Sequence, residues 1–335
     1  MSADTYTQVK DITVNITTAS VAGSVGLGNP LVIAGKAAKA VAYAECNNLD
    51  AVVKAGFAAD TEVYKACAAI FAQKNKPKTV AVVATDGKVA DWLTANKDKD
   101  FRQIVPVLGT EDSTVAELVT VVSGLDNKML FLEVATSAEL PKTQSERVVA
   151  VVYGGASDYA NAAVVGESAG RAAGSFTYKN LVLTGIEPED LSPAEVEAIH
   201  EAGGICIVKK AGDVVTSEGK TTDGEYIDIV DSKDYIISNI VYQVQKALNS
   251  NGKLPYTNVG ISQLESIVTG VLADAFGQGI IAANEDGTPA YSTSFATREE
   301  TNASDISSRT YNGGHFSFKF AGAIHNGQIN GTVEI

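Results

Sequence analysis

The sequence predicts an α/β fold in which helices flank a parallel or mixed sheet, with a C-terminal α+β portion and an extended β-arm at each end. The main observation is a set of short, continuous apolar runs, which are typical of strands buried on both faces of a sheet. These runs cover residues 31–34, 80–83, 104–108, 129–134, 148–152, 181–183 and 205–208. Helical patterns separate them, and this alternation indicates a doubly wound or related core.

Capping residues predict where several helices of this core begin. Thr61 precedes an apolar helical pattern that runs to residue 71, and Asp112 or Ser113 is expected to cap a helix over 112–119. Ser192 is followed by a proline and then by Glu195, which is the spacing of a capping box with proline in the first turn.

The pattern changes after residue 210. Residues 211–229 are rich in Gly, Thr and Asp and predict a β-hairpin, two long helices are expected over 232–249 and 261–276, and the segment from Phe295 onward is strand-like again. The predicted organisation therefore has four parts. They are an N-terminal linking arm (1–28), an α/β body (29–210), a C-terminal α+β portion (211–320) and a C-terminal linking arm (321–335).

Each predicted arm has the two-residue alternation of a strand with one buried face. The apolar positions of the N-terminal arm are Ile12, Val14 and Ile16, and its flexible exit contains Gly23, Gly26 and Gly28. The C-terminal arm has a small-residue hinge at Gly322, and its apolar positions are Ile329, Val333 and Ile335. Neither arm has a hairpin partner beside it, and unpaired strand edges favour pairing with another chain. We therefore expect the protein to be a subunit of an assembly.

Composition argues against several classes of function. The chain has 335 residues, a net charge of −14 and a pI of about 4.7, so nucleic acid would be repelled on average. No apolar run approaches the length of a membrane span, and residues 1–6 lack the features of a secretion signal. The three cysteines (Cys46, Cys67 and Cys206) lie far apart and are expected to be small, reduced, buried residues. The three histidines do not cluster, and no phosphate-binding loop is present, so neither a metal nor a cofactor is expected.

One motif suggests catalysis. Residues 166–170 match the G-x-S-x-G nucleophile elbow, which would make Ser168 a nucleophile. Its base would be His315 or His325, and its acid Asp228 or Asp231. The elbow requires a strand directly before it, whereas residues 158–173 have the pattern of one continuous helix of small residues. We therefore expect that the protein is not an enzyme, and the alternative is a soluble α/β serine hydrolase that uses Ser168.

Several segments, in order, are similar to known sequences. The ending contains Arg309, then His315-Phe-Ser-Phe-Lys-Phe-Ala-Gly-Ala-Ile-His325, and later Ile329, Gly331 and Val333. Further matching segments are 226–235, 253–261, 271–276 and 279–281, with 63–64, Phe71, Gln73, Pro77 and 80–83 upstream. Together they resemble the contractile tail sheath proteins of bacteriophages and of R-type bacteriocin-like particles.

The resemblance implies a sheath-protein core whose subunits stack as hexameric rings around a tail tube and contract to drive that tube through a target cell envelope. The arms of such subunits add strands to the sheets of their neighbours, and the hinge residues let the arms swing. The linking residues implied here are Ile12, Val14 and Ile16 in the N-terminal arm and Ile324, His325, Ile329, Val333 and Ile335 in the C-terminal arm. The implied partners are the tail tube, baseplate and tail terminator proteins. The implied location is a virion tail assembled in the bacterial host cytoplasm, without cofactors, nucleic acid or membrane insertion.

Overall fold

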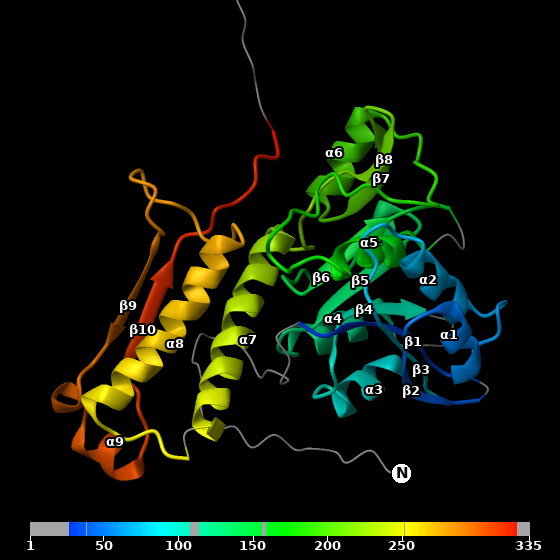
Figure 1. The fold of residues 1–335 in the computed structure, drawn as a ribbon. Helices are drawn as coiled ribbons and strands as arrows, with labels where there is room; N and C mark the ends of the chain where they lie inside the picture. Colours follow the sequence, from blue (N-terminus) through cyan, green and yellow to red (C-terminus); the bar gives the residue numbers. More distant parts are fainter. Residues whose placement is uncertain (1–26, 38, 108–113, 156–158, 251, 327–335) are drawn as a thin grey trace, which may run out of the picture. The chain divides into compact units, whose positions relative to one another are not determined.

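A computed structural model of the chain describes residues 27–37, 39–107, 114–155, 159–250 and 252–326 (Figure 1). The described residues form two compact units. We call residues 27–232 with 322–326 the sheet unit, and residues 233–321 the ribbon unit. Among the described residues, the chain passes between the units inside a long helix at Ser232–Lys233 and again at Ala321–Gly322.

The sheet unit is built on an eight-stranded mixed sheet with the order β2-β3-β1-β4-β5-β6-β7-β8. Its strands are β1 (Asn29–Ala34), β2 (Val41–Cys46), β3 (Val80–Ala84), β4 (Phe101–Val107), β5 (Met129–Val134), β6 (Val148–Val152), β7 (Ile205–Lys210) and β8 (Asp213–Thr216). The six inner strands pair in parallel, and the edge strands β2 and β8 pair antiparallel. Strands β3 and β6 are buried at every position, as their continuous apolar runs predict. The predicted α/β class with a mixed sheet is confirmed.

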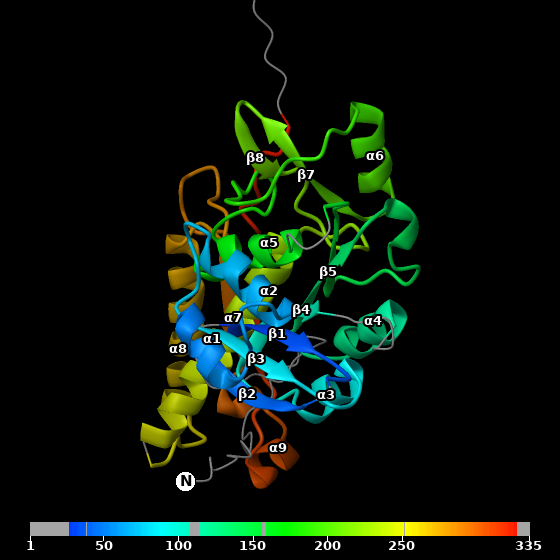
Figure 2. The same cartoon turned by 90° about the vertical axis from the view of Figure 1, so that its right-hand side faces the viewer.

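Helices cover both faces of this sheet. On one face, α1 (Leu49–Ala55), α2 (Glu62–Phe71) and α5 (Ala160–Ala169) pack over a core that includes Val82 and Phe131. On the other face, α3 (Val89–Ala95) and α4 (Val115–Ser123) pack over a core that includes Leu31 and Leu130 (Figure 2). Helix α6 (Pro193–Glu201) buries Ile199 in a smaller cluster, and a 3-10 turn spans Ser137–Glu139. Burial of the apolar stripes of these helices is the main stabilising term for the layers.

The helix starts follow the sequence at two places and differ at a third. The side chain of Thr61 caps α2 by accepting from the Tyr64 N–H, and Ser192 and Glu195 form the predicted capping box of α6. The expectation that Asp112 or Ser113 caps the next helix is wrong, because α4 begins after Thr114, whose side chain forms a capping box with Glu117. The reciprocal bonds of this box satisfy two backbone donors at once, which favours the later start.

Two further predictions about the sheet unit need correction, and three of its elements were not predicted. Residues 181–183 are not a strand of the sheet, since only Val182 forms a bridge, to Val215 of β8. The hairpin predicted over 211–229 is instead formed by β7 and β8, with its turn at Ala211 and Gly212, both of which have positive φ. Strand β2 and helices α1 and α3 were not predicted.

The ribbon unit consists of two long helices and a two-stranded antiparallel ribbon. Its elements are α7 (Ile227–Ser250, which begins in the sheet unit), α8 (Asn258–Gly277), β9 (Tyr291–Phe295), a 3-10 turn (Arg298–Glu300), α9 (Ala303–Ser308) and β10 (Gly314–Phe318). Residues of α7, α8, β9 and β10 share one apolar core that includes Ile240, Leu272 and Phe316. The two predicted long helices are present, but α7 begins five residues before the predicted position and α8 begins three residues before it.

Helix α8 is also long and apolar enough, by length and composition alone, to cross a membrane. One 18-residue window in it has a mean hydropathy of 1.2. Its apolar residues Val268, Val271 and Leu272 are each at most 5% exposed and belong to the core of the ribbon unit. About a third of the window, 33%, is buried in this way, and a single helix that passes this test is weak evidence for a membrane span.

Candidate assembly site

The first described part of the C-terminal arm is bound to the sheet unit through His325. Its imidazole Nε2 lies 2.8 Å from Thr177 Oγ1, and its Nδ1 lies 3.3 Å from Glu218 Oε1, an ion-pair distance when the ring is protonated. The ring of Tyr226 meets the imidazole edge-on, with the centroids 5.0 Å apart and the planes at 87°. The side chain of His325 is only 9% exposed. We call Thr177, Glu218, Tyr226 and His325 the arm clasp.

Local structure brings the segments of the arm clasp together. Gly219 has no side chain, and a Cβ there would lie 2.6 Å from the backbone nitrogen of Lys179, so the loop after β8 can lie directly against residues 177–179. The Gly219 carbonyl in turn accepts from the Ile227 N–H at 3.1 Å, which holds the start of α7 beside the same loop. Glycine at 219 therefore lets the Thr177, Glu218 and Tyr226 segments converge.

Glu218 is the acidic centre of the arm clasp. Burial alone would raise the pKa of this carboxyl, but the Gly219 N–H and the charges of Lys179 and His325 together hold the pKa below its ordinary value. Lys179 Nζ lies 3.5 Å from Glu218 Oε2, and it also donates to Asn326 Oδ1 at 3.4 Å. Lys179 therefore links Glu218 to the residue that follows His325.

A second carboxyl lies close enough to His325 to interact electrostatically. Burial raises the pKa of Asp228, and the charge of His325 opposes that rise. The Oδ1 atom of Asp228 is buried and has no hydrogen-bond partner among the described residues. The imidazole therefore lies near two carboxyls, Glu218 and Asp228, with the Lys179 ammonium beside Glu218.

The hinge predicted at Gly322 lies in an exposed link of three residues. Gly322 has φ +66°, and a Cβ at this position would meet nothing within 4 Å. Before the link, the Ala321 N–H donates to the Ile280 carbonyl at 2.9 Å, and after it His325 enters the arm clasp. Ile324, a predicted linking residue, is 94% exposed. The geometry leaves Gly322 room to rotate, and its hinge role stays a prediction.

Few residues of the N-terminal arm can be placed. Gly28 has φ +102°, and a Cβ there would lie 2.9 Å from the Phe101 carbonyl carbon, so this position packs closely against the start of β4. The Asn29 N–H donates to the Asp100 carbonyl at 3.4 Å. The other predicted arm residues lie outside the described residues, namely Ile12, Val14, Ile16, Gly23, Gly26, Ile329, Val333 and Ile335. Their linking and hinge roles stay predictions.

The ribbon of β9 and β10 has a core side and an exposed side. Residues Phe316 and Phe318 of β10 pack on the core side of the ribbon, whereas Ser292 and Ser317 are exposed on its other face and bond to each other at 2.9 Å. Within the described part of the chain, neither β9 nor β10 pairs with a third strand over 291–295 and 314–318. Both outer edges of the ribbon therefore offer backbone groups to an incoming strand.

The hydrolase alternative fails at Ser168. This residue lies inside α5 and is 2% exposed; its Oγ accepts from Gln103 Nε2 at 3.1 Å and donates to the Val165 carbonyl at 3.2 Å. Neither proposed base is bonded to it, because His325 belongs to the arm clasp and His315 is exposed on β10. Asp231 is bonded instead to Arg102 and Tyr178. A helix is present here, but α5 (Ala160–Ala169) is shorter than the predicted 158–173, and Ser168 lies in its last turn rather than at a strand-to-helix elbow.

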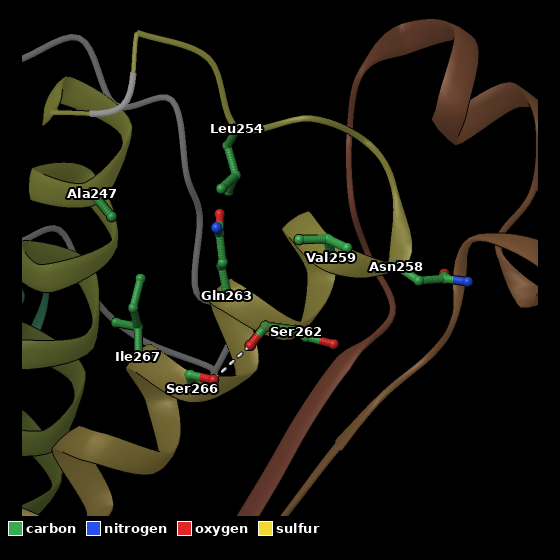
Figure 3. Close-up of a pocket in the computed structure, with 8 residues that line it drawn as sticks. All are labelled: Ala247, Leu254, Asn258, Val259, Ser262, Gln263, Ser266 and Ile267. Carbon is green, nitrogen blue, oxygen red and sulfur yellow. Dashed lines mark hydrogen bonds between the residues drawn. The ribbon is translucent and has the colours of Figure 1, made fainter.

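An open groove in the ribbon unit offers no catalytic group either. It has a volume of 690 Å³ and lies between the C-terminal part of α7 and the N-terminal part of α8 (Figure 3). Its lining residues are Ala247, Leu254, Asn258, Val259, Ser262, Gln263, Ser266 and Ile267. No acid, base or cation lies among them. Across the described residues, no cluster of three or more metal-ligating side chains occurs, and the three cysteines are buried free thiols.

The fold is that of contractile sheath proteins. The chain is similar to the helical sheath of the anti-feeding prophage in the contracted state, with a TM-score of 0.69 and 15% identity over 98% of this chain and 100% of that one. It is also similar to the contracted sheath complex of an extracellular contractile injection system, PVC, with a TM-score of 0.70 and 11% identity over 100% and 99% of the two chains. The sheath tail protein Lin1278 from Listeria innocua matches with a TM-score of 0.58 and 12% identity, over 82% and 90%. No protein-family model and no curated protein sequence matches the chain.

Sequence reasoning named His325 but missed its partners. Thr177 lies 148 positions away along the chain, in a loop without a motif, and Glu218 lies in a segment predicted to be a hairpin. One signal for these partners is present in the sequence, namely Gly219 directly after Glu218. A glycine in a loop can mark a place where two backbone segments approach closely.

Proposed function

We propose that this protein is the structural subunit of a contractile tail sheath. It polymerises as stacked hexameric rings around a tail tube and contracts to drive the tube through the target cell envelope. The observation that carries the proposal is the match to sheath chains over 98% and 100% of this chain and 100% and 99% of those chains, which extends through both units.

The ribbon of β9 and β10 supports a mechanism for polymerisation. Its two open edges match the number of arms, and each arm has the alternation of a strand with one apolar face. In the proposed array, arms of neighbouring subunits dock at these edges by adding strands. Each aliphatic side chain that becomes fully buried contributes about 1.5–3 kcal/mol, before the cost of ordering the arm. Contacts of this head-to-tail type propagate into open helical arrays.

Contraction then requires no catalytic chemistry in this chain. The subunits rearrange as rigid bodies while the paired arms keep them connected, and the free energy is held in the metastable extended array. The described residues contain no catalytic set at Ser168 or in the ribbon-unit groove, which supports a subunit without enzymatic activity. The tail tube, baseplate and tail terminator proteins are the proposed partners, within a virion tail that assembles in the host cytoplasm. The net charge of −14 favours a tube surface of opposite sign.

Truncation of the C-terminal arm tests this function. A chain that ends at Gly327 is expected to fold, as judged by circular dichroism, but to remain in the supernatant when the full chain sediments as polymer. A matched pair of full-length variants separates strand pairing from mere length. The triple variant Ile329→Ser, Val333→Ser and Ile335→Ser is expected to abolish sedimentation. The triple variant Asn330→Ser, Thr332→Ser and Glu334→Ser is expected to preserve it. Polymer formed by the truncated chain would refute the linking role.

A further inference from the structure

The C-terminal arm does not become independent of its own subunit at the glycine hinge. His325, three residues after Gly322, is buried in the arm clasp of the sheet unit, and Asn326 is bonded to Lys179. The exposed residues in between are Gly322, Ala323 and Ile324. The described contacts therefore hold the chain to the sheet unit as far as Asn326, and Gly322 lies between two fixed points.

Those fixed points belong to different units. Ala321 is bonded to Ile280 in the ribbon unit, and Phe320 forms a bridge with Ile281 there, whereas His325 is held in the sheet unit. Four Cα–Cα steps separate Ala321 from His325, so the two Cα atoms stay within about 14 Å of each other in any conformation. With the arm clasp closed, the ribbon unit is attached to the sheet unit at both of its ends, through α7 and through this link.

We propose that the arm clasp, with His325 as its positioning residue, sets the point on the sheet unit from which the C-terminal arm departs. This inference rests on the proposed sheath function. With the clasp closed, every subunit presents its arm from one place, which favours a single helical arrangement. With the clasp open, residues 322–326 lengthen the free arm, and neighbours are joined at variable distances.

Hydrogen exchange tests closure of the arm clasp without any assembly. In the full chain at low concentration, His325→Ala is expected to raise the exchange rate of the amides of Lys179 and Gly219 about tenfold, because these amides donate to the clasp side chains of Thr177 and Glu218, which His325 also contacts. The control His200→Ala removes another half-buried imidazole of the sheet unit, whose Nε2 is bonded to Ser217, and leaves these amides unchanged. Unchanged exchange in His325→Ala would overturn the proposal.

Electron microscopy of the polymers tests the consequence. His325→Ala is expected to polymerise into tubes of several diameters or without regular striation, and His200→Ala into tubes like those of the original chain. A second variant, Thr177→Val, keeps the side-chain shape and removes one bonding partner of the imidazole, so it is less prone to misfold. It is also expected to give tubes of several diameters or without regular striation. Regular tubes from both clasp variants would overturn the inference and leave the sheath function intact. Absence of tubes from the original chain would count against the proposed function instead, and hydrogen exchange would then decide on the clasp.

Discussion

Arg102 of β4 and Asp231 of α7 form an ion pair in the interior of the sheet unit, with Nη2 2.5 Å from Oδ1, although 129 positions separate them in the sequence. Both side chains are 4% exposed. Tyr178 donates to the second oxygen of Asp231 at 2.9 Å, and Arg102 donates to the Asn127 carbonyl at 2.7 Å. The first turns of α7, just before the chain enters the ribbon unit, are thereby attached to the central sheet.

Breaking this pair is expected to destabilise the sheet unit strongly. Asp231→Leu removes the carboxylate that lies against the buried Arg102 guanidinium and should lower the free energy of unfolding by about 3–5 kcal/mol. The double variant Arg102→Met with Asp231→Leu should lose less than the sum of the single variants Arg102→Met and Asp231→Leu, because it removes both members of the buried pair. Urea denaturation measures all three, and strictly additive losses would show that the two side chains do not act as a pair.

Two helix glycines are expected to respond to alanine with opposite signs. In α5, a Cβ at Gly166 would lie 2.6 Å from the carbonyl oxygen of Ile70 on α2, so Gly166→Ala forces the helices apart and should destabilise by about 1–3 kcal/mol. In α8, a Cβ at Gly270 meets nothing within 4 Å, so Gly270→Ala should stabilise by about 0.5–1 kcal/mol through helix propensity. Thermal unfolding followed by circular dichroism compares them, and a stabilised Gly166→Ala variant would contradict the packing of α5 on α2.

Lys128 is expected to give the sheet unit a stability that rises with pH in the alkaline range. Burial lowers the pKa of its ammonium to about 8, and the nearby Arg102 charge acts in the same direction. Its Nζ bonds to the carbonyls of Lys99 and Phe101. Between pH 8 and the ordinary value of 10.5, the unfolded chain binds this proton and the folded chain does not, so stability increases with pH there.

The matching variant is Lys128→Met, which has no charge to bury. Relative to it, the original chain should gain about 3 kcal/mol in free energy of unfolding between pH 7 and pH 10.5. Urea denaturation of both proteins at the two pH values gives this difference, and the other groups that titrate in this range are common to both. An equal pH dependence in the two proteins would show that Lys128 keeps an ordinary affinity for its proton.

Ser168 is expected to be inert toward an organophosphate probe. Its hydroxyl is buried in α5, and the groups bonded to it, the Gln103 amide and the Val165 carbonyl, are not bases. Mass spectrometry of the intact protein should therefore detect no adduct after incubation at neutral pH. A stoichiometric adduct that disappears in Ser168→Ala would restore the hydrolase hypothesis.

The sequence predicted the inner strands well and the edges poorly, for a physical reason. Valine-rich runs such as 148–152 are buried on both faces of the sheet. A strand of this kind is apolar at every position, so it can be recognised from the sequence alone. The edge strand β2 mixes alanine and polar residues, and residues 181–183 are apolar although they make only one bridge. The start of α7 was missed because Ile227-Asp-Ile-Val alternates like a strand, and its helical state depends on long-range contacts such as that of Asp231.

The arm clasp shows the same limit at the candidate site. The sequence showed the alternation in both arms and pointed to His325 as a linking residue. It did not point to Thr177 or Glu218, which lie in no motif and come together through the loop packing at Gly219. The Thr114 and Glu117 box was present in the sequence as T-x-x-E and was passed over for an earlier cap. Local signals of this kind can be read from a sequence, whereas contacts across 148 positions require the fold.

The most direct test of the central claim is negative-stain electron microscopy of the purified full chain over a range of concentrations. The proposed sheath function predicts hollow cylinders with regular cross-striations that become more abundant as the concentration rises. Small, discrete particles at every concentration, both alone and when the protein is produced together with its tail tube protein, would contradict it.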